Sequence, residues 1–237
     1  VQLFTHATRE HFKHFKAEPI TFREQETRDF VASLPFTLTP DQKKCAWQIL
    51  QDLARAEPMN RLLEGDVGSG KTVVAAIAMK NVALNGKQSI FLAPTEILAQ
   101  QHFETLTALL PLQRIGLLTH SQQRINKEKS SKKEIIEHLA ANGIDIVIGT
   151  HALLQERVQF LNLALAIVDE QHRFGVKQRK TLREESGNST TLPHLLSMTA
   201  TPIPRTLALT LYGDLDLSII KTKPPGRLPV ITRIVDA

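Results

Sequence analysis

Residues 65–72 constrain the fold of this 237-residue chain more than any other segment. They read Gly65-Asp66-Val67-Gly68-Ser69-Gly70-Lys71-Thr72, which fits the pattern G-x-x-x-x-G-K-[ST]. An apolar pair precedes them and a helix-forming run follows, as in a strand, loop and helix that bind a polyphosphate through backbone N–H groups. All eight residues are therefore predicted to bind the nucleotide, with Lys71 on the β- and γ-phosphates and Thr72 on Mg²⁺. A glycine-rich turn that matches by chance is the alternative.

A second pattern adds hydrolysis to phosphate binding. The apolar run 165–168 ends in two carboxylates, Asp169 and Glu170. A buried parallel strand has this pattern, and ligands gather at the carboxyl ends of such strands. Asp169 is predicted to hold the metal ion through water, and Glu170 to polarise the attacking water. With Lys71 they form the predicted catalytic set, and a solvated Asp-Glu turn is the alternative.

Strand and helix patterns alternate along the chain, which predicts an α/β fold with a parallel sheet covered by helices on both faces. Thr39 and Pro40 are expected to open a helix over 41–55, and residues 121–140 to form a basic amphipathic helix. Strands are expected at 89–93, 115–118 and 145–148, and a helix at about 204–212. A strand is also expected at 230–235.

Composition limits the function classes. The net charge of +5 permits a nucleic-acid partner without requiring one. The single cysteine, Cys45, excludes an internal disulfide and suits a reducing cytoplasm. No run of 18 apolar residues occurs, so no membrane partner is expected.

Further motifs follow one another in a specific order. They are Gln42, Ala93-Pro94-Thr95-Glu96-Ile97-Leu98-Ala99, Gly149-Thr150-His151, Asp169-Glu170-Gln171-His172, Arg173-Phe174-Gly175-Val176, and Met198-Thr199-Ala200-Thr201-Pro202-Ile203-Pro204-Arg205-Thr206-Leu207. Their order resembles the first RecA-like motor domain of superfamily 2 helicases. More narrowly, it resembles the RecG family of ATP-dependent branched-DNA helicases, over about residues 34–237.

That resemblance implies ATP and Mg²⁺ as cofactors and branched duplex DNA as a partner. Gln42 would read adenine, with Phe36 stacked on the base, although a core position for Phe36 is equally favoured. Residues implied to contact the DNA phosphate backbone are Pro94, Thr95, Thr119, Gly149, Thr150, His151 and Arg173. Residues implied to couple the nucleotide to DNA are His172, Thr199, Thr201 and Arg205, where the two threonine hydroxyls would exchange hydrogen bonds with Asp169 or Glu170.

Two features depart from the family pattern. The family usually has glycine where His120 stands, which puts the phosphate contact at residues 119–121 in question. The basic stretch 124–133 is interpreted as a solvated helix face rather than a DNA contact.

The chain is expected to be a piece of a longer protein. Residues 1–34 are predicted to be a helical linker from an N-terminal wedge region, 35–223 the first motor domain, and 224–237 a linker and the start of the second motor domain. That second domain is an expected partner that would supply an arginine finger, so the chain alone should hydrolyse ATP poorly. A monomer in the bacterial cytoplasm, associated with the nucleoid, is expected.

Two other functions are weighed against this one. The first is the motor domain of a duplex translocase of the transcription-repair coupling type, which usually carries glutamate where Gln171 stands and another residue where Ser69 stands. The second is a nucleotide-sensing module without motor activity, which would have no need to keep Lys71, Thr72, Asp169 and Glu170 together.

Overall fold

The computed structural model describes residues 16–150, 153, 158–170, 191–201 and 215–222. Helices and strands alternate from α3 to β3, as the sequence predicted. The helices are α2 (Glu24–Ser33), α3 (Pro40–Leu53), α4 (Lys71–Leu84), α5 (Glu96–Leu109) and α6 (Lys132–Ala140). The strands are β1 (Asn60–Gly65), β2 (Gln88–Ala93), β3 (Ile115–Leu118), β4 (Gln123–Ile125), β5 (Glu128–Lys129), β6 (Ile146–Thr150), β7 (Leu163–Asp169), β8 (His194–Thr199) and β9 (Asp216–Ile220).

The strands form one sheet in the order β5-β4-β3-β6-β2-β7-β8-β1-β9. All neighbouring pairs are parallel except β3 with β4 and β4 with β5, which are antiparallel at one edge. Parallel strands place their carboxyl ends at the same edge of a sheet. The strand that leads into the phosphate-binding loop, β1, therefore ends beside β8, and β8 ends beside β7.

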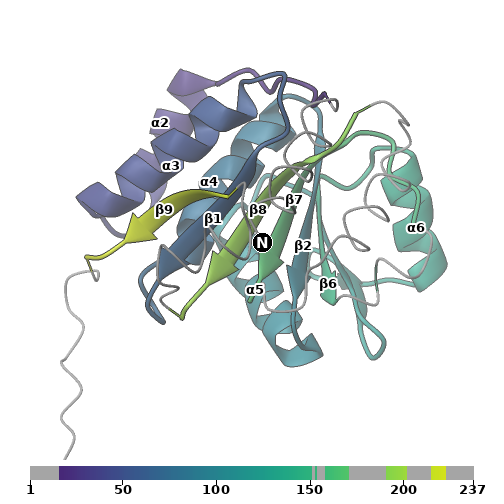
Figure 1. Ribbon diagram of the computed structural model, residues 1–237. Coiled ribbons are helices and arrows are strands. Elements are labelled where there is room, and N and C mark those ends of the chain that lie inside the picture. The colour runs from purple at the N-terminus through teal and green to yellow at the C-terminus, as the bar shows by residue number, and fades with distance from the viewer. Residues whose placement is uncertain (1–15, 151–152, 154–157, 171–190, 202–214, 223–237) are drawn as a thin grey trace, which may run out of the picture.

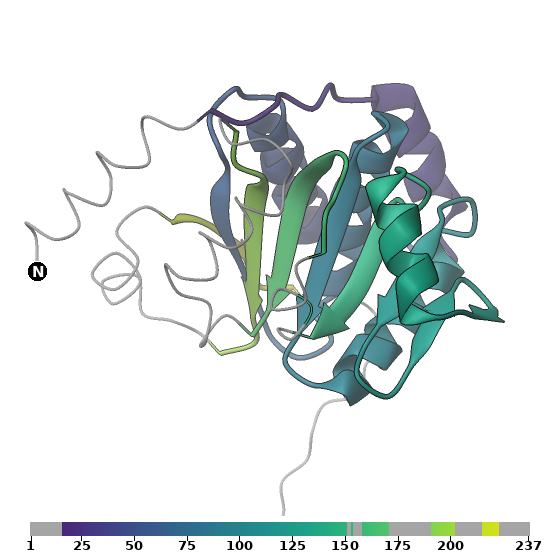
Figure 2. The ribbon, with the colours of Figure 1, turned by 90° about the vertical axis from the view of Figure 1, so that its right-hand side faces the viewer.

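Apolar side chains alternate between the two faces of the sheet. Phe91 and Ala93 of β2 belong to one buried cluster, and Ile90 and Leu92 of the same strand belong to another. Helices α2, α3, α4 and α5 pack on the first face, and α6 packs on the second. Figures 1 and 2 show α2, α3 and α4 on one side of the sheet and α6 on the other. The predicted architecture, a mostly parallel sheet with helices on both faces, is confirmed.

The start of α3 agrees with its sequence signals. Thr39 is the N-cap: its hydroxyl accepts a hydrogen bond from the Gln42 backbone N–H at 3.2 Å. The Gln42 side chain returns the contact by accepting from the Thr39 N–H at 2.8 Å, which completes a capping box. Pro40 occupies the first helical position, where its missing N–H costs nothing. The helix ends at Leu53, two residues before the predicted end.

The prediction of a basic helix over 121–140 was wrong in its first half. Residues 123–129 form the two short antiparallel strands β4 and β5, and helix α6 begins only at Lys132. Asn126 adopts φ +49°, a left-handed conformation that asparagine tolerates in tight turns and that ends any helix. Arg124 also lies over the Phe103 ring at 5.4 Å, so it is not part of a solvated helix face.

Residues 16–34 pack on α3 and α4 in this structure. The backbone N–H groups of Ala17 and Ile20 donate to the carbonyls of Ala56 and Leu53, both at 2.8 Å. Ile20 and Phe30 are buried in the same apolar cluster as α3 and α4. This segment therefore contributes to the core, while the predicted domain boundaries at 34 and 223 stay predictions.

The sequence analysis did not predict strand β9, because the polar residues Asp216 and Ser218 interrupt its apolar pattern. The expected helix at 204–212 and strand at 230–235 lie outside the described residues. No described helix is long and apolar enough to cross a membrane. Cys45 is buried in the core, and that burial raises the pKa of its thiol to about 11.

His194 at the start of β8 is a buried titratable group outside the predicted site. It is 1% exposed, its Nδ1 accepts from the Met59 N–H at 3.0 Å, and its Nε2 lies 3.2 Å from the Glu18 carbonyl. Burial lowers the pKa of His194 below its usual value of 6.5, since the charged ring would lose its hydration.

We expect the free energy of unfolding to fall as pH drops below 6.5, because the unfolded chain then binds a proton that folded His194 does not. One such group contributes at most about 1.4 kcal/mol per pH unit. Urea titrations at pH 7.5 and 5.5 would measure the loss, with His194→Gln as the variant. An equal pH dependence in both proteins would contradict the assignment.

Candidate nucleotide and nucleic-acid site

One edge of the sheet gathers nearly all the predicted site residues that the structure describes. On one half of this edge, the ends of β1, β8 and β7 lead into the phosphate-binding loop, Thr199 and Asp169. On the other half, the ends of β2, β6 and β3 lead into Pro94, Thr150 and Thr119. The sheet order thus separates the residues predicted for the nucleotide from those predicted for DNA, and places β7 next to β2 at the border.

The phosphate-binding loop has the backbone shape that its sequence requires. Gly70 is the N-cap of α4 with φ +90°, and Gly68 has φ +72°, both in the left-handed region that favours glycine. A Cβ on Gly70 would also collide with the Gln42 side chain. The loop is closed by the Ser69 N–H, which donates to the Asp66 carbonyl at 3.0 Å. The first turn of α4 therefore begins at the end of this loop without a side-chain cap, and a helix N-terminus of this kind favours an anion.

Lys71 points into this loop from the first turn of α4. Its ammonium group donates to the carbonyls of Gly65 at 2.6 Å and Asp66 at 3.3 Å. Burial lowers the pKa of Lys71, and the nearby carboxylates of Asp169, Glu170 and Asp66 oppose that shift. The lysine thus lies between the loop and the acidic pair, where its charge can serve a bound phosphate.

Gln42 and Phe36 lie at the proposed adenine end. Gln42 is 2% exposed, and its Nε2 donates to the Ser69 carbonyl at 2.8 Å while its Oε1 accepts from Thr39. A side-chain amide has two donor hydrogens and two acceptor lone pairs, so one of each is left for a base. Phe36 is 46% exposed, which disfavours a core role. Adenine recognition by these two residues stays a prediction.

The acidic pair sits at the end of β7 as predicted. Asp169 is 8% exposed, and Glu170 follows it with φ +54°. Left-handed backbone is uncommon in a residue other than glycine and is concentrated at functional sites. The Glu170 Oε1 accepts from the Ala200 backbone N–H at 3.2 Å. The sequence did not identify Ala200, because a backbone donor leaves no signal in the residue type.

Thr199 and Thr201 contact each other. Their hydroxyl oxygens are 3.0 Å apart, and the Thr201 N–H donates to the Thr199 hydroxyl at 3.2 Å. The segment 199–201 therefore forms a compact turn whose middle residue meets Glu170. The contact that the structure shows between this segment and the acidic pair comes from the Ala200 backbone, so the predicted hydrogen bonds from the two threonine hydroxyls to Asp169 or Glu170 stay a prediction.

The residues present fit Mg²⁺ and ATP. The Ser69 hydroxyl is buried without a hydrogen-bond partner among the described residues, beside the space that a Cβ on Gly65 would fill. Thr72 supplies a hydroxyl in the first turn of α4, and Asp169 supplies a carboxylate, both of which are oxygen ligands that Mg²⁺ prefers. A bound Mg²⁺ would neutralise phosphate charge.

The half of the edge predicted to contact DNA is built around α5 and a tight turn. Thr95 caps α5 by accepting from the Leu98 N–H at 3.3 Å, directly after Pro94. Thr119 is 7% exposed, and its hydroxyl closes a turn with Gln122, accepting from its N–H at 3.0 Å. Gly149 lies so close to the Leu118 carbonyl that a side chain would not fit. The DNA contacts predicted for Pro94, Thr95, Thr119, Gly149 and Thr150 stay predictions.

Four predicted residues lie outside the described part of the chain. They are His151, His172, Arg173 and Arg205. Their predicted roles, in DNA binding for His151 and Arg173 and in coupling for the other two, therefore stay predictions.

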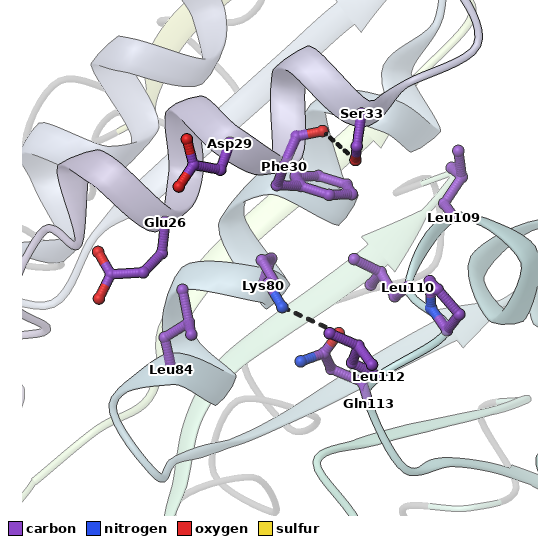
Figure 3. Close-up of a pocket in the computed structure, with 11 residues that line it drawn as sticks. Glu26, Asp29, Phe30, Ser33, Lys80, Leu84, Leu109, Leu110, Leu112 and Gln113 are labelled. Atoms are coloured by element: carbon purple, nitrogen blue, oxygen red, sulfur yellow. Dashed lines mark hydrogen bonds between the residues drawn. The ribbon is translucent and has the colours of Figure 1, made fainter.

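A pocket away from this edge is separate from the candidate site. Its volume is about 410 Å³, and it lies among α2, the carboxyl-terminal part of α4 and the segment after α5. Figure 3 shows Glu26 and Asp29 at its rim, and the hydrogen bond that the Lys80 ammonium group donates to the Gln113 Oε1 at 3.3 Å. The phosphate-binding loop is at the other end of α4, so this pocket takes no part in the nucleotide site.

Residues 39–210 match the family model described as DEAD/DEAH box helicase. The chain is 49% identical over 214 residues to the ATP-dependent DNA helicase RecG of Streptococcus pneumoniae, covering 90% of this chain and 31% of that protein. It is 46% identical over 234 residues to RecG of Bacillus subtilis, covering 98% and 33%. The chain thus spans about a third of the length of these relatives.

Comparison with solved structures gives the same fold, and RecG is again among the relatives. A structure of RecG bound to a three-way DNA junction matches with a TM-score of 0.81 and 40% identity, covering 96% of this chain and 30% of that one. The UvsW helicase of bacteriophage T4 matches with a TM-score of 0.58 at 14% identity, covering 86% and 70%, and shows the fold alone. With the phosphate-binding loop, the Asp169-Glu170 pair and the parallel sheet in place, the chain belongs to the DEAD/DEAH box helicase family, and its predicted resemblance to RecG is confirmed.

Proposed function

We propose that this chain is the ATP-binding motor domain of a DNA helicase that remodels branched DNA, such as replication forks and Holliday junctions, in repair and recombination. The observation that carries the proposal is the shared sheet edge. It holds Lys71, Asp169 and Glu170 on one half and Thr95 and Thr119 on the other. The RecG relatives and the RecG structure with a three-way junction support DNA as the partner.

The chemistry assigned to this chain is positioning and charge stabilisation. Lys71 would hold the terminal phosphates, Thr72 and Asp169 would hold Mg²⁺, and Glu170 would orient the water that attacks. A second motor domain is proposed to close over the nucleotide and to supply an arginine finger. Since such a finger contributes about 10³–10⁵ in rate, the chain alone should hydrolyse ATP very slowly.

The nucleotide state would reach the DNA side through the sheet edge. Glu170 contacts Ala200, so a change at the acidic pair can shift the segment 199–201. We propose that this shift alters the approach of the second motor domain and moves the protein along duplex DNA. The bacterial relatives support a place of action at the nucleoid in the cytoplasm. A monomer is proposed as the working form.

ATP hydrolysis by the full-length protein that contains this chain tests the function. The rate with forked or four-way DNA is compared with the rate on linear duplex of equal length, and Lys71→Ala serves as the inactive control. We expect branched DNA to stimulate hydrolysis more strongly. Equal stimulation by linear duplex would favour the polymerase-coupled translocase, and no stimulation by any DNA would favour the nucleotide-sensing module.

A further inference from the structure

A histidine outside every predicted motif contacts the predicted metal ligand. His102 lies on α5, and its Nε2 is 2.9 Å from the Asp169 Oδ2. Both side chains are largely buried, with 13% and 12% of their surfaces exposed. Because an ionised carboxylate only accepts hydrogen bonds, the Nε2 of His102 must carry the hydrogen. The contact is therefore directional and fixes one oxygen of Asp169.

The histidine ring is itself held in place. It packs against Phe91 of β2, with ring centroids 4.5 Å apart and the planes inclined at 46°. Phe91 is fully buried, and its strand β2 lies in the sheet between β6 and β7. A ring clamped in this way can define the orientation of its partner. The carboxylate lone pairs that do not face His102 stay available to the water shell of a metal ion.

The same helix also contacts the predicted DNA side. Near its N-terminus, Glu96 accepts from the Ser121 backbone N–H at 3.1 Å, and the Gln100 Oε1 accepts from the Gln122 Nε2 at 2.9 Å. Those residues belong to the turn that Thr119 closes. Helix α5 thus joins the 119–122 turn to Asp169 across the border between β2 and β7.

We propose that His102 is a positioning residue that orients Asp169 toward metal-bound nucleotide and ties the nucleotide half of the sheet edge to the DNA half. The proposal rests on the function proposed above. Hydrogen-bonding partners of metal-ligating side chains typically change metal affinity or activity by about 10- to 100-fold when they are removed. A histidine that merely fills space beside Phe91 would have no such effect.

The test measures binding of a fluorescent ADP to the full-length protein that contains this chain, with Mg²⁺ and with EDTA. His102→Leu keeps a side chain of similar size beside Phe91 but removes the donor, and His102→Gln places an amide N–H near the position of Nε2. We expect His102→Leu to weaken Mg²⁺-dependent binding by about 10- to 100-fold. Binding in EDTA should be unchanged, and His102→Gln should restore most of the loss. Thr105→Val, exposed on the same helix, is the matched control.

Each outcome has a distinct meaning. Unchanged Mg²⁺-dependent binding in His102→Leu, or equal losses in the leucine and glutamine variants, would overturn the inference and leave the proposed function intact. A loss in EDTA as large as the loss in Mg²⁺ would indicate damage to the phosphate-binding loop and would also overturn it. If the unchanged full-length protein binds no ADP under either condition, the proposed function fails and the inference fails with it.

A second measurement tests the link to DNA. In the full-length protein, His102→Leu is expected to lower kcat in the presence of DNA and to raise the Mg²⁺ concentration needed for half-maximal rate, with a smaller change in basal hydrolysis. His102→Gln should recover the DNA-stimulated rate. Equal fractional losses with and without DNA would contradict the connecting role of α5.

Discussion

Replacing Glu170 with glutamine is expected to reduce ATP turnover of the full-length protein by about 10²–10⁴-fold while nucleotide affinity stays close to that of the unchanged protein. Glutamine has nearly the same shape, and its side-chain oxygen can still accept from the Ala200 N–H, which Glu170 Oε1 contacts at 3.2 Å. The substitution therefore removes the charge that polarises water and leaves the contact with segment 199–201 in place. Steady-state hydrolysis and fluorescent-nucleotide binding measure the two effects separately.

Lys71→Ala is the contrasting variant for this experiment. It removes the ammonium group that lies against the Gly65 and Asp66 carbonyls inside the loop. Binding and hydrolysis should then fall together, since the lysine would contact the phosphates in the ground state as well as in the transition state. A Glu170→Gln protein that hydrolyses ATP at the full rate would show that another group orients the water.

The largest expected effect on stability comes from Asp52→Ala, with a loss of about 3–5 kcal/mol in the free energy of unfolding. Asp52 of α3 accepts from the Arg61 guanidinium of β1 at 2.6 Å, and their side chains are 5% and 9% exposed. Arg61 also donates to the Ser218 hydroxyl of β9 at 2.9 Å. Without Asp52, the arginine charge would remain buried and poorly compensated. The Asp216 Oδ2 lies 3.7 Å from the Arg61 Nη2, but the Asp216 side chain is exposed to solvent, which weakens its attraction.

Urea denaturation measures this loss, and two variants make the result specific. Arg55→Ala removes an exposed partner of Asp52 and should cost no more than about 1 kcal/mol. Arg61→Met in the Asp52→Ala background should recover much of the stability, since it removes the uncompensated charge. A loss below about 1 kcal/mol for Asp52→Ala would mean that water reaches Arg61 and replaces the carboxylate.

Local signals predicted the phosphate-binding loop and the start of α3, where short-range contacts decide the structure. The phosphate-binding loop needs glycine at its left-handed positions and a helix directly after it, and both requirements are visible in residues 65–72. Thr39, Pro40 and Gln42 identify a helix start because capping involves neighbours only. The basic segment 121–140 was misread, because a charge pattern without Pro or Gly does not reveal the turn at Asn126.

The contacts that complete the site were beyond local reasoning. Gln42 bonds to Ser69 across 27 residues, and His102 bonds to Asp169 across 67. Glu170 meets a backbone N–H at Ala200, a residue with no polar side chain. Each pair is set by which strands are neighbours, and strand order depends on how the whole core packs.

Residue types alone predict the nucleotide chemistry proposed for this protein, because Lys71, Thr72, Asp169 and Glu170 would carry it in their side chains and the loop needs only local geometry. Which groups lie together depends on the topology of the sheet. The order β2-β7-β8-β1 brings α5, the acidic pair, segment 199–201 and the phosphate-binding loop to one edge. That order follows from burying apolar side chains on both faces of a parallel sheet, a property of the whole chain that no single motif encodes.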